Sequence, residues 1–186
     1  NLERYPASPF PANRPVRFLY LGRLMTEKGV RELFEAAQRL HAEGFDFRLD
    51  LVGFFEDISQ TEVEHLQNLG IVHFHGFQQD PLPWYVAADC VVLPSWHEGM
   101  ANTNLECAAM GRPIITSNIP GCKEAVLEGK SGLQLNNIFP CNLSFKVESG
   151  NCRSGFIVSF LDQDTFFIDS QFLERKDICQ IGEESL

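Results

Sequence analysis

The stretch CVVLPSWHEGMANTNLECAAMGRPIITS, residues 90–117, contains the pattern that decides the fold. It begins with a wholly apolar run, CVVLP, and ends with a second short strand-like run, PIITS. Between the two, ANTNLECAAMG predicts a helix that stops at Gly111. A short apolar strand followed by a helix and another strand is typical of a parallel sheet that helices cover on both faces.

The same alternation extends outward through most of the chain. Further strands are predicted at 17–22, 47–53, 71–76 and 131–135, and further helices at 29–44, 61–70, 81–89 and 121–129. The sequence therefore predicts an α/β fold, a Rossmann-like doubly wound parallel sheet. Ligands bind such sheets outside the carboxyl ends of the strands, so three loops are expected at one rim: 22–28, 76–80 and 94–102.

Both ends of the chain depart from this pattern. Residues 1–15 are rich in proline and are interpreted as a linker from a preceding domain that the chain is expected to lack. Residues 16–136 form the predicted domain, and residues 137–186 an irregular tail in which FIVSFLDQ and TFFIDSQFL fit strands or a poor helix. One hypothesis is a reading-frame error near 148–155, which would leave the tail poorly ordered. The alternative is a genuine extension that pads the sheet.

Composition narrows the class of protein. The 186 residues are 44% hydrophobic and 22% charged, as in ordinary globular proteins. A formal net charge of −10 argues against a nucleic-acid binder, which needs clustered Lys and Arg. The six cysteines have no metal or redox spacing, and no signal peptide or membrane-spanning run is recognised, so we expect a cytoplasmic protein.

The loop GRLMTEKG, residues 22–29, lies between a predicted strand and a predicted helix. It places Arg23 and Lys28 beside the start of that helix. Two cations and a helix dipole directed at one spot suit a diphosphate. The alternative interpretation is that both residues are solvated surface charges.

Two carboxylates, Glu98 and Glu106, present a similar choice. Glu98 follows a buried strand and so lies at the ligand rim, where a carboxylate can accept hydrogen bonds from sugar hydroxyls. Residues 100–103 open the next helix with free amide N–H groups, and Glu106 lies further along it. The alternative is that Thr103 caps the helix and Glu106 completes a capping box, which leaves Glu98 as an exposed loop acid.

Other chemistry-bearing residues predict no separate site. His73 and His75 alternate along one predicted strand without a third ligand at metal spacing, so no metal site is predicted. Trp84 and Tyr85 are expected to pack against the sheet edge.

Several motifs in this order resemble the nucleotide-binding C-terminal domain of retaining glycosyltransferases of the family 4 type, which is one half of the GT-B architecture. The resemblance covers residues 1–136. It is most specific in two glutamates with seven residues between them, Glu98 and Glu106, followed by GRP. The other matching strings are NLERY, GRLMTEKG, VHFHGF, LPSWHEGMANTNLECAAMGRPIITSNIPGCKEAV and GKSGL. Bacterial enzymes that build capsules, exopolysaccharides or O-antigens are the members that it resembles most.

The resemblance implies a site for the donor diphosphate. Arg23 and Lys28 match the pair of cations that binds it. Backbone amides at the helix start would complete this site, contributed by Met100, Ala101, Asn102 and Thr103.

The same resemblance assigns the rest of the donor. Glu98 matches the catalytic acid that contacts hydroxyls of the donor sugar, with Gly99 beside it. Glu106 matches the acid that holds the ribose. Phe77 and Gln78 fall, by a loose match, where the family contacts the base.

The implied function is that of the donor-binding half of a retaining glycosyltransferase. It would move a sugar from a nucleotide-diphosphate sugar, UDP rather than GDP, to an acceptor hydroxyl in polysaccharide or glycolipid synthesis. No metal or other cofactor is expected, because cations and helix-start amides stabilise the leaving diphosphate. The acceptor, a glycan or a lipid-linked sugar, would bind through the preceding domain, so the isolated chain is expected to be inactive. Peripheral association of the full-length enzyme with the inner face of the membrane is a further expectation. The alternative is a non-catalytic nucleotide-sugar-binding module or a truncated remnant.

Overall fold

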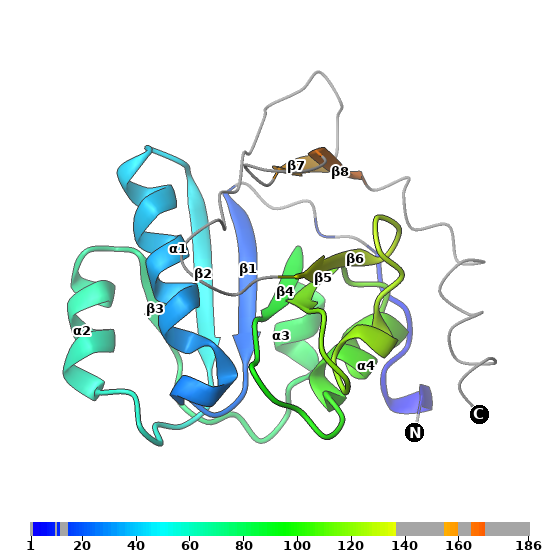
Figure 1. Cartoon of the computed structure of the whole chain (residues 1–186), viewed down its shortest axis with the longest axis horizontal. Helices are drawn as coiled ribbons and strands as arrows, with labels where there is room; N and C mark the ends of the chain where they lie inside the picture. The colour runs from blue at the N-terminus through cyan, green and yellow to red at the C-terminus, as the bar shows by residue number, and fades with distance from the viewer. Residues whose placement is uncertain (1, 10, 12–14, 137–154, 160–164, 170–186) are drawn as a thin grey trace.

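A six-stranded parallel sheet forms the centre of the protein, with the strand order β3-β2-β1-β4-β5-β6 (Figure 1). The computed structural model describes residues 2–9, 11 and 15–136, and the backbone of 155–159 and 165–169. The strands are β1 (Val16–Leu21), β2 (Phe47–Val52), β3 (Val72–Phe74), β4 (Cys90–Leu93), β5 (Ile114–Ser117) and β6 (Gly132–Leu135). The predicted doubly wound sheet is confirmed, and its winding reverses between β1 and β4, which are neighbours.

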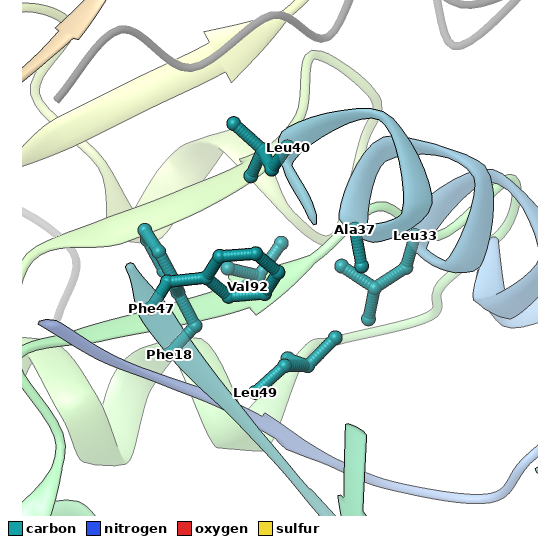
Figure 2. Close-up of a pocket in the computed structure, with 7 residues that line it drawn as sticks. All are labelled: Phe18, Leu33, Ala37, Leu40, Phe47, Leu49 and Val92. Atoms are coloured by element: carbon teal, nitrogen blue, oxygen red, sulfur yellow. The ribbon is translucent and has the colours of Figure 1, made fainter. Parts of the chain in front are cut away.

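Four α-helices cover this sheet, and they are α1 (Val30–Ala42), α2 (Gln60–Asn68), α3 (Leu82–Ala87) and α4 (Asn102–Ala109). Side chains of α1 and α2 pack into one apolar core, and those of α3 and α4 into a second. Figure 2 shows part of the first core, a small apolar hollow beneath α1. Its lining comes from α1 and from β1, β2 and β4: Leu33, Ala37, Leu40, Phe18, Phe47, Leu49 and Val92. Both faces of the sheet are therefore buried, as the apolar strands require.

The helix predicted at 121–129 is wrong in extent. Only a single 3-10 turn forms there, η3 (Lys123–Ala125). Gly121 precedes it at a φ of 87°, and Val126 follows in an extended conformation with a φ of −129° and a ψ of 121°. Val126 is 4% exposed in the second core, so burying this side chain turns the backbone out of the helix after one turn.

The two ends of the chain are described in part. Near the N-terminus there is one 3-10 turn, η1 (Leu2–Arg4). In the tail, β7 (Gly155–Ser159) and β8 (Thr165–Asp169) pair antiparallel, so strands replace the ambiguous prediction for these two segments. The remaining predictions for 137–186 lie outside the described residues.

Candidate functional site

The loop after β1 packs directly against the loop after β4. Gly29 has a φ of 68°, and a Cβ atom there would lie 1.8 Å from the carbonyl oxygen of Pro94. The backbone N–H of Trp96 also donates to the carbonyl of Glu27, at 2.9 Å. Glycine is needed because only a residue without a side chain permits this approach at a left-handed φ. The contact places the 3-10 turn η2 (Thr26–Lys28) beside the loop that contains Glu98.

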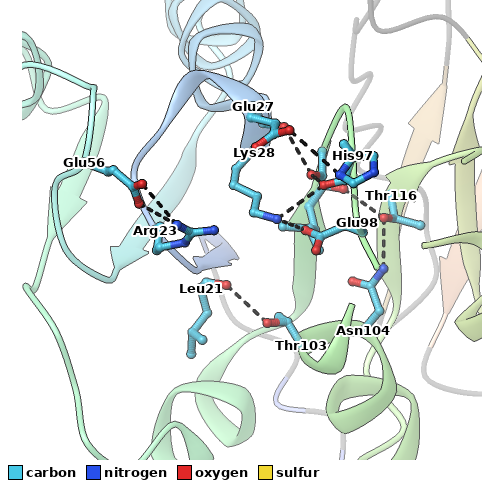
Figure 3. Close-up of polar contacts among 12 residues, drawn as sticks. Leu21, Arg23, Glu27, Lys28, Glu56, His97, Glu98, Thr103, Asn104 and Thr116 are labelled. Atoms are coloured by element: carbon cyan, nitrogen blue, oxygen red, sulfur yellow. Dashed lines mark hydrogen bonds and ion pairs between the residues drawn. The ribbon is translucent and has the colours of Figure 1, made fainter. Parts of the chain in front are cut away.

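Lys28 and Glu98 form an ion pair at this junction. The Lys28 Nζ lies 2.7 Å from Glu98 Oε1, and the two side chains are only 15% and 12% exposed. The same ammonium lies 3.4 Å from the carbonyl oxygen of His97 (Figure 3). The structure thus brings together one residue predicted to bind the diphosphate and one predicted to bind the sugar.

Arg23, the other predicted diphosphate ligand, lies on the same loop but points toward Glu56 (Figure 3). Its Nη1 lies 2.8 and 3.1 Å from the two carboxylate oxygens of Glu56, which follows β2. The two side chains are 45% and 40% exposed, and such surface pairs contribute little to stability. Arg23 can therefore exchange this partner for a stronger anion at small cost.

The start of α4 offers fewer free amides than the sequence predicts. Ala101 N–H donates to the carbonyl of Gly121 at 2.7 Å, and Asn102 N–H to the carbonyl of Met100 at 3.0 Å. Within the described part of the chain, the amides of Gly99, Met100 and Thr103 have no hydrogen-bond acceptor. These three are the ones left to bind an anion.

Gly121, which sequence reasoning did not single out, supports the loop of Glu98. A Cβ atom at Gly121 would lie 2.5 Å from the carbonyl oxygen of Glu98 and 2.9 Å from that of Gly99. The N–H of Gly121 donates to Glu124 Oε2 at 2.9 Å, which holds the turn in place. The Pro-Gly dipeptide at 120–121 signals a turn, but the contact with Glu98 depends on the fold.

Asn104 ties the first turn of α4 to the end of β5. Its side-chain amide donates to Thr116 Oγ1 at 2.9 Å and lies 3.4 Å from the carbonyl oxygen of Cys122. Thr116 in turn donates to the carbonyl of Leu93 at 2.8 Å, which fixes the amide orientation (Figure 3). The Asn104 Oδ1 is buried and has no hydrogen-bond partner among the described residues. This buried network was not predicted.

The structure contradicts the capping-box interpretation of Thr103 and Glu106. The N-cap of α4 is Ala101, without a side-chain cap, and the Thr103 hydroxyl donates instead to the carbonyl of Leu21 at 3.3 Å. Glu106 Oε2 accepts a hydrogen bond of 2.7 Å from the Tyr85 hydroxyl. The box fails because the helix begins two residues earlier than the pattern implies and a tertiary partner takes the carboxylate.

Two exposed aromatic rings lie beyond the carboxyl ends of β2 and β3. Phe77, predicted at the base site, is 68% exposed, and Phe54, which was not predicted, is 48% exposed. Their ring centroids are 6.3 Å apart in an edge-to-face arrangement. The Gln78 side-chain amide donates to the carbonyl of His75 at 2.8 Å. The two rings offer an apolar platform, and Gln78 is held beside it.

The two histidines of β3 and its flank belong to a different cluster. His75 Nε2 lies 2.7 Å from Asp50 Oδ1, and Asp50 also accepts hydrogen bonds from Arg17 and Arg48. Burial acts to raise the pKa of Asp50, but the bonds from His75 and the two arginines outweigh it and lower that pKa. Burial also lowers the pKa of His73. No group of three or more metal-ligating side chains occurs in the described part of the chain.

Comparison with known proteins identifies the family. A family model described as glycosyl transferases group 1 matches residues 15–143, which is more than half of the chain. The chain belongs to the group 1 glycosyltransferases. The match includes the loop of Lys28, the loop of Glu98 and helix α4, so the resemblance inferred from the sequence is confirmed.

Curated relatives of this glycosyltransferase domain include two bacterial glycosyltransferases. It is 34% identical over 129 residues to the N,N'-diacetylbacillosaminyl-diphospho-undecaprenol alpha-1,3-N-acetylgalactosaminyltransferase of Campylobacter jejuni, covering 69% of this chain and 34% of that protein. It is 30% identical over 117 residues to the capsular polysaccharide biosynthesis glycosyltransferase CapM of Staphylococcus aureus, covering 61% of this chain and 30% of that protein. The chain thus spans about a third of the length of these relatives.

Solved structures share its fold. HepE from Anabaena, determined in complex with UDP-glucose, aligns with a TM-score of 0.59 at 22% identity, over 74% of this chain and 42% of HepE. The C-terminal domain of the group 1 protein LpcC from Francisella tularensis aligns with a TM-score of 0.60 at 19% identity, over 74% of this chain and 81% of that domain. At these identities the likeness establishes the fold alone, a Rossmann-like domain that forms one half of the GT-B architecture. Among the helices described for this chain, none has the length and apolarity needed to cross a bilayer.

Proposed function

We propose that this chain is the donor-binding half of a retaining glycosyltransferase that uses a nucleotide-diphosphate sugar. The observation that supports it best is the meeting of a cation, a carboxylate and free amides at the carboxyl edge of the sheet. Lys28 and Glu98 lie 2.7 Å apart there, and the unpaired amide of Thr103 belongs to the adjoining first turn of α4. A diphosphate needs the cation and the amides, and the attached sugar needs the carboxylate.

In the proposed reaction, the bond between the sugar C1 and the diphosphate oxygen breaks. The acceptor oxygen bonds to C1 on the same face, and the acceptor hydroxyl gives its proton to the departing diphosphate oxygen on that face. Negative charge grows on the departing diphosphate, where Arg23, Lys28 and the helix-start amides would stabilise it. Glu98 would accept hydrogen bonds from sugar hydroxyls and so hold C1 in place.

The pairing of Lys28 with Glu98 fits this assignment. In the absence of donor, the two largely buried charges satisfy each other at 2.7 Å. A diphosphate offers Lys28 a stronger anion, and the released carboxylate of Glu98 then becomes available to the sugar. Binding of the diphosphate to Lys28 and binding of the sugar to Glu98 are thereby linked, because both require the same ion pair to open.

The proposal extends to the ribose and the base of the donor. Glu106 would accept hydrogen bonds from the ribose hydroxyls, and Phe77 with Phe54 would pack against the base. A UDP-sugar is the donor favoured here, because HepE, which shares the fold, binds UDP-glucose. The acceptor would be a glycan or a lipid-linked sugar held by a further domain. The full-length enzyme would be cytoplasmic and would associate peripherally with the inner face of the membrane.

The test of donor binding is calorimetric titration of UDP and of GDP into the wild-type chain and two variants. We expect UDP to bind more tightly than GDP, and Glu106→Ala to weaken UDP binding about tenfold, because hydrogen bonds to a charged group are lost. Glu43→Ala removes an exposed acid at the far end of α1 and serves as the matched control. Failure of the wild-type chain to bind either nucleotide, or equal losses in both variants, would contradict the proposal.

Catalysis is tested separately, on a longer protein that contains this chain. The configuration at C1 of the product, read by NMR from the coupling of its anomeric proton, should equal that of the donor. Inversion would contradict a retaining mechanism. Nucleotide binding without sugar transfer to any acceptor would instead favour the non-catalytic binding module.

A further inference from the structure

The carboxylate of Glu106 is held by a buried tyrosine. The Tyr85 side chain is fully buried, and its hydroxyl donates to Glu106 Oε2 at 2.7 Å. Burial raises the pKa of Tyr85, so the hydroxyl keeps its proton and remains a donor. Because Tyr85 lies on α3 and Glu106 on α4, the bond joins two helices and fixes the orientation of the carboxylate.

The N-terminal segment, residues 5–9, packs beside Tyr85 and Glu106. The ring of Tyr5 meets the ring of Tyr85 edge to face, with centroids 6.1 Å apart and planes at 68°. Burial raises the pKa of Tyr5, and interaction with the nearby Glu106 carboxylate raises it further. Tyr5 therefore touches the tyrosine that orients Glu106 and lies beside the carboxylate itself.

Arg112 anchors the same segment to α3. Its side chain is 1% exposed, and its guanidinium donates to the carbonyls of Tyr85 and Val86 at 2.8 and 3.1 Å. It also donates to the Ser8 carbonyl at 3.2 Å, the Ser8 hydroxyl at 2.6 Å and the Pro9 carbonyl at 3.0 Å. A buried guanidinium needs all of its donors satisfied. Here the segment supplies three of the five acceptors, so it is part of the fold of this face.

We propose that residues 5–9 form part of the ribose site. Docked on Arg112, they hold Tyr5 against Tyr85, and Tyr85 keeps Glu106 in the orientation that the ribose hydroxyls require. Tyr5 and Tyr85 are positioning residues, because they act on the nucleotide through Glu106. The inference rests on the proposed function and adds that nucleotide affinity depends on how the chain runs before β1.

The experiment measures dissociation constants for UDP and for 2′,3′-dideoxy-UDP, which lacks the hydroxyls assigned to Glu106. Wild type, Tyr85→Phe and Tyr5→Ala are compared by NMR titration. We expect the wild type to prefer UDP. In Tyr85→Phe, UDP should bind about tenfold more weakly while dideoxy-UDP is unchanged, because Glu106 is no longer held in the orientation that the ribose hydroxyls require. Tyr5→Ala should show a smaller loss of the same kind.

The ratio of the two affinities separates positioning from a general effect on folding. Equal losses for UDP and dideoxy-UDP, or no loss for either, would overturn the inference. If Tyr85→Phe does not fold, Tyr5→Ala decides the question, because Tyr5 lies outside the sheet and its helices. Absence of UDP binding by the wild type would contradict the proposed function itself. UDP binding with an unchanged ratio in the variants would contradict only the role of the segment.

Discussion

Two acidic residues of this protein, Glu98 and Asp50, are held by cations in different ways. Glu98 is paired with Lys28 at 2.7 Å, and its side chain is 12% exposed at the ligand rim. Asp50 lies within β2, is 3% exposed, and contacts Arg17, Arg48 and His75 at 2.8, 2.9 and 2.7 Å. Asp50 has its acceptor capacity filled from three sides, whereas Glu98 has, among the residues that the structure describes, a single partner that a ligand can take.

The difference teaches how to separate a structural charge cluster from a binding one. A ligand that displaced the partners of Asp50 would have to replace four hydrogen bonds from three side chains to a buried carboxylate, which costs more than a weak contact returns. A ligand at Glu98 exchanges one bond and offers its own anion to Lys28. The positions of the two acids agree with this distinction. Glu98 lies in the loop after the carboxyl end of β4, where ligands bind such sheets, and Asp50 lies inside β2.

The largest effect on stability is expected from Asp50→Ala. It leaves two arginines and His75 without their shared acceptor, and we expect the free energy of unfolding to fall by about 3 kcal/mol. Urea unfolding measures this loss. The folded variant should bind UDP as the wild type does. A weakened UDP affinity with unchanged stability would reverse the roles assigned to the two acids.

Lys28→Ala should have the converse effect. We expect UDP to bind at least about tenfold more weakly, because a charge-assisted contact to the diphosphate is lost. The free energy of unfolding should fall by about 1–2 kcal/mol, less than in Asp50→Ala, because the largely buried Glu98 carboxylate loses one partner. Lys130→Ala, an exposed lysine before β6, is the control for loss of charge. Equal UDP binding by the two variants would remove Lys28 from the site.

A smaller effect should come from the glycine that supports the Glu98 loop. Gly121 and Gly44 both have a positive φ, of 87° and 79°, but only Gly121 has a neighbour that a Cβ atom would strike. Alanine at either position should cost about 1–2 kcal/mol of backbone strain, measured by thermal unfolding. Gly121→Ala alone should also weaken binding of UDP-sugar, because it displaces the backbone of Glu98. The account fails here if Gly44→Ala weakens donor binding as much.

The smallest effect is a pH dependence. Because the pKa of Asp50 is lowered in the folded state, its contribution to stability is present above about pH 4 and is lost as pH falls through the lowered value. The stability of the wild type should therefore fall more steeply below about pH 4 than that of Asp50→Asn. Urea unfolding at a series of pH values checks the difference. Parallel curves for the two proteins would show that Asp50 does not titrate as described.

Much of the fold was predictable because the evidence for it is local. The apolar run at 90–94 and the regular alternation of strands and helices are sufficient for a doubly wound parallel sheet. The strand ends then place Lys28 and Glu98 at one rim without knowledge of any contact. The helix at 121–129 was overestimated because the burial of Val126, a tertiary effect, ends it after one turn.

The details of the site could not be predicted because they depend on residues far apart in sequence. Glu106 fits a capping box and a ribose ligand equally well on spacing, and only the fold shows that Tyr85 takes its carboxylate. The approach of Gly121 to Glu98 and the pairing of Phe54 with Phe77 likewise need the loops in place. Docking of Ser8 on Arg112 joins residues 104 positions apart, which no local pattern indicates.

A crystal structure of the chain with UDP tests the central claim most directly. The account predicts that Lys28 Nζ leaves Glu98 and contacts the diphosphate, that the amide of Thr103 donates to a phosphate oxygen, and that Glu106 accepts hydrogen bonds from the ribose. UDP bound elsewhere, or bound with the Lys28–Glu98 ion pair intact and Glu106 away from the ribose, would contradict it.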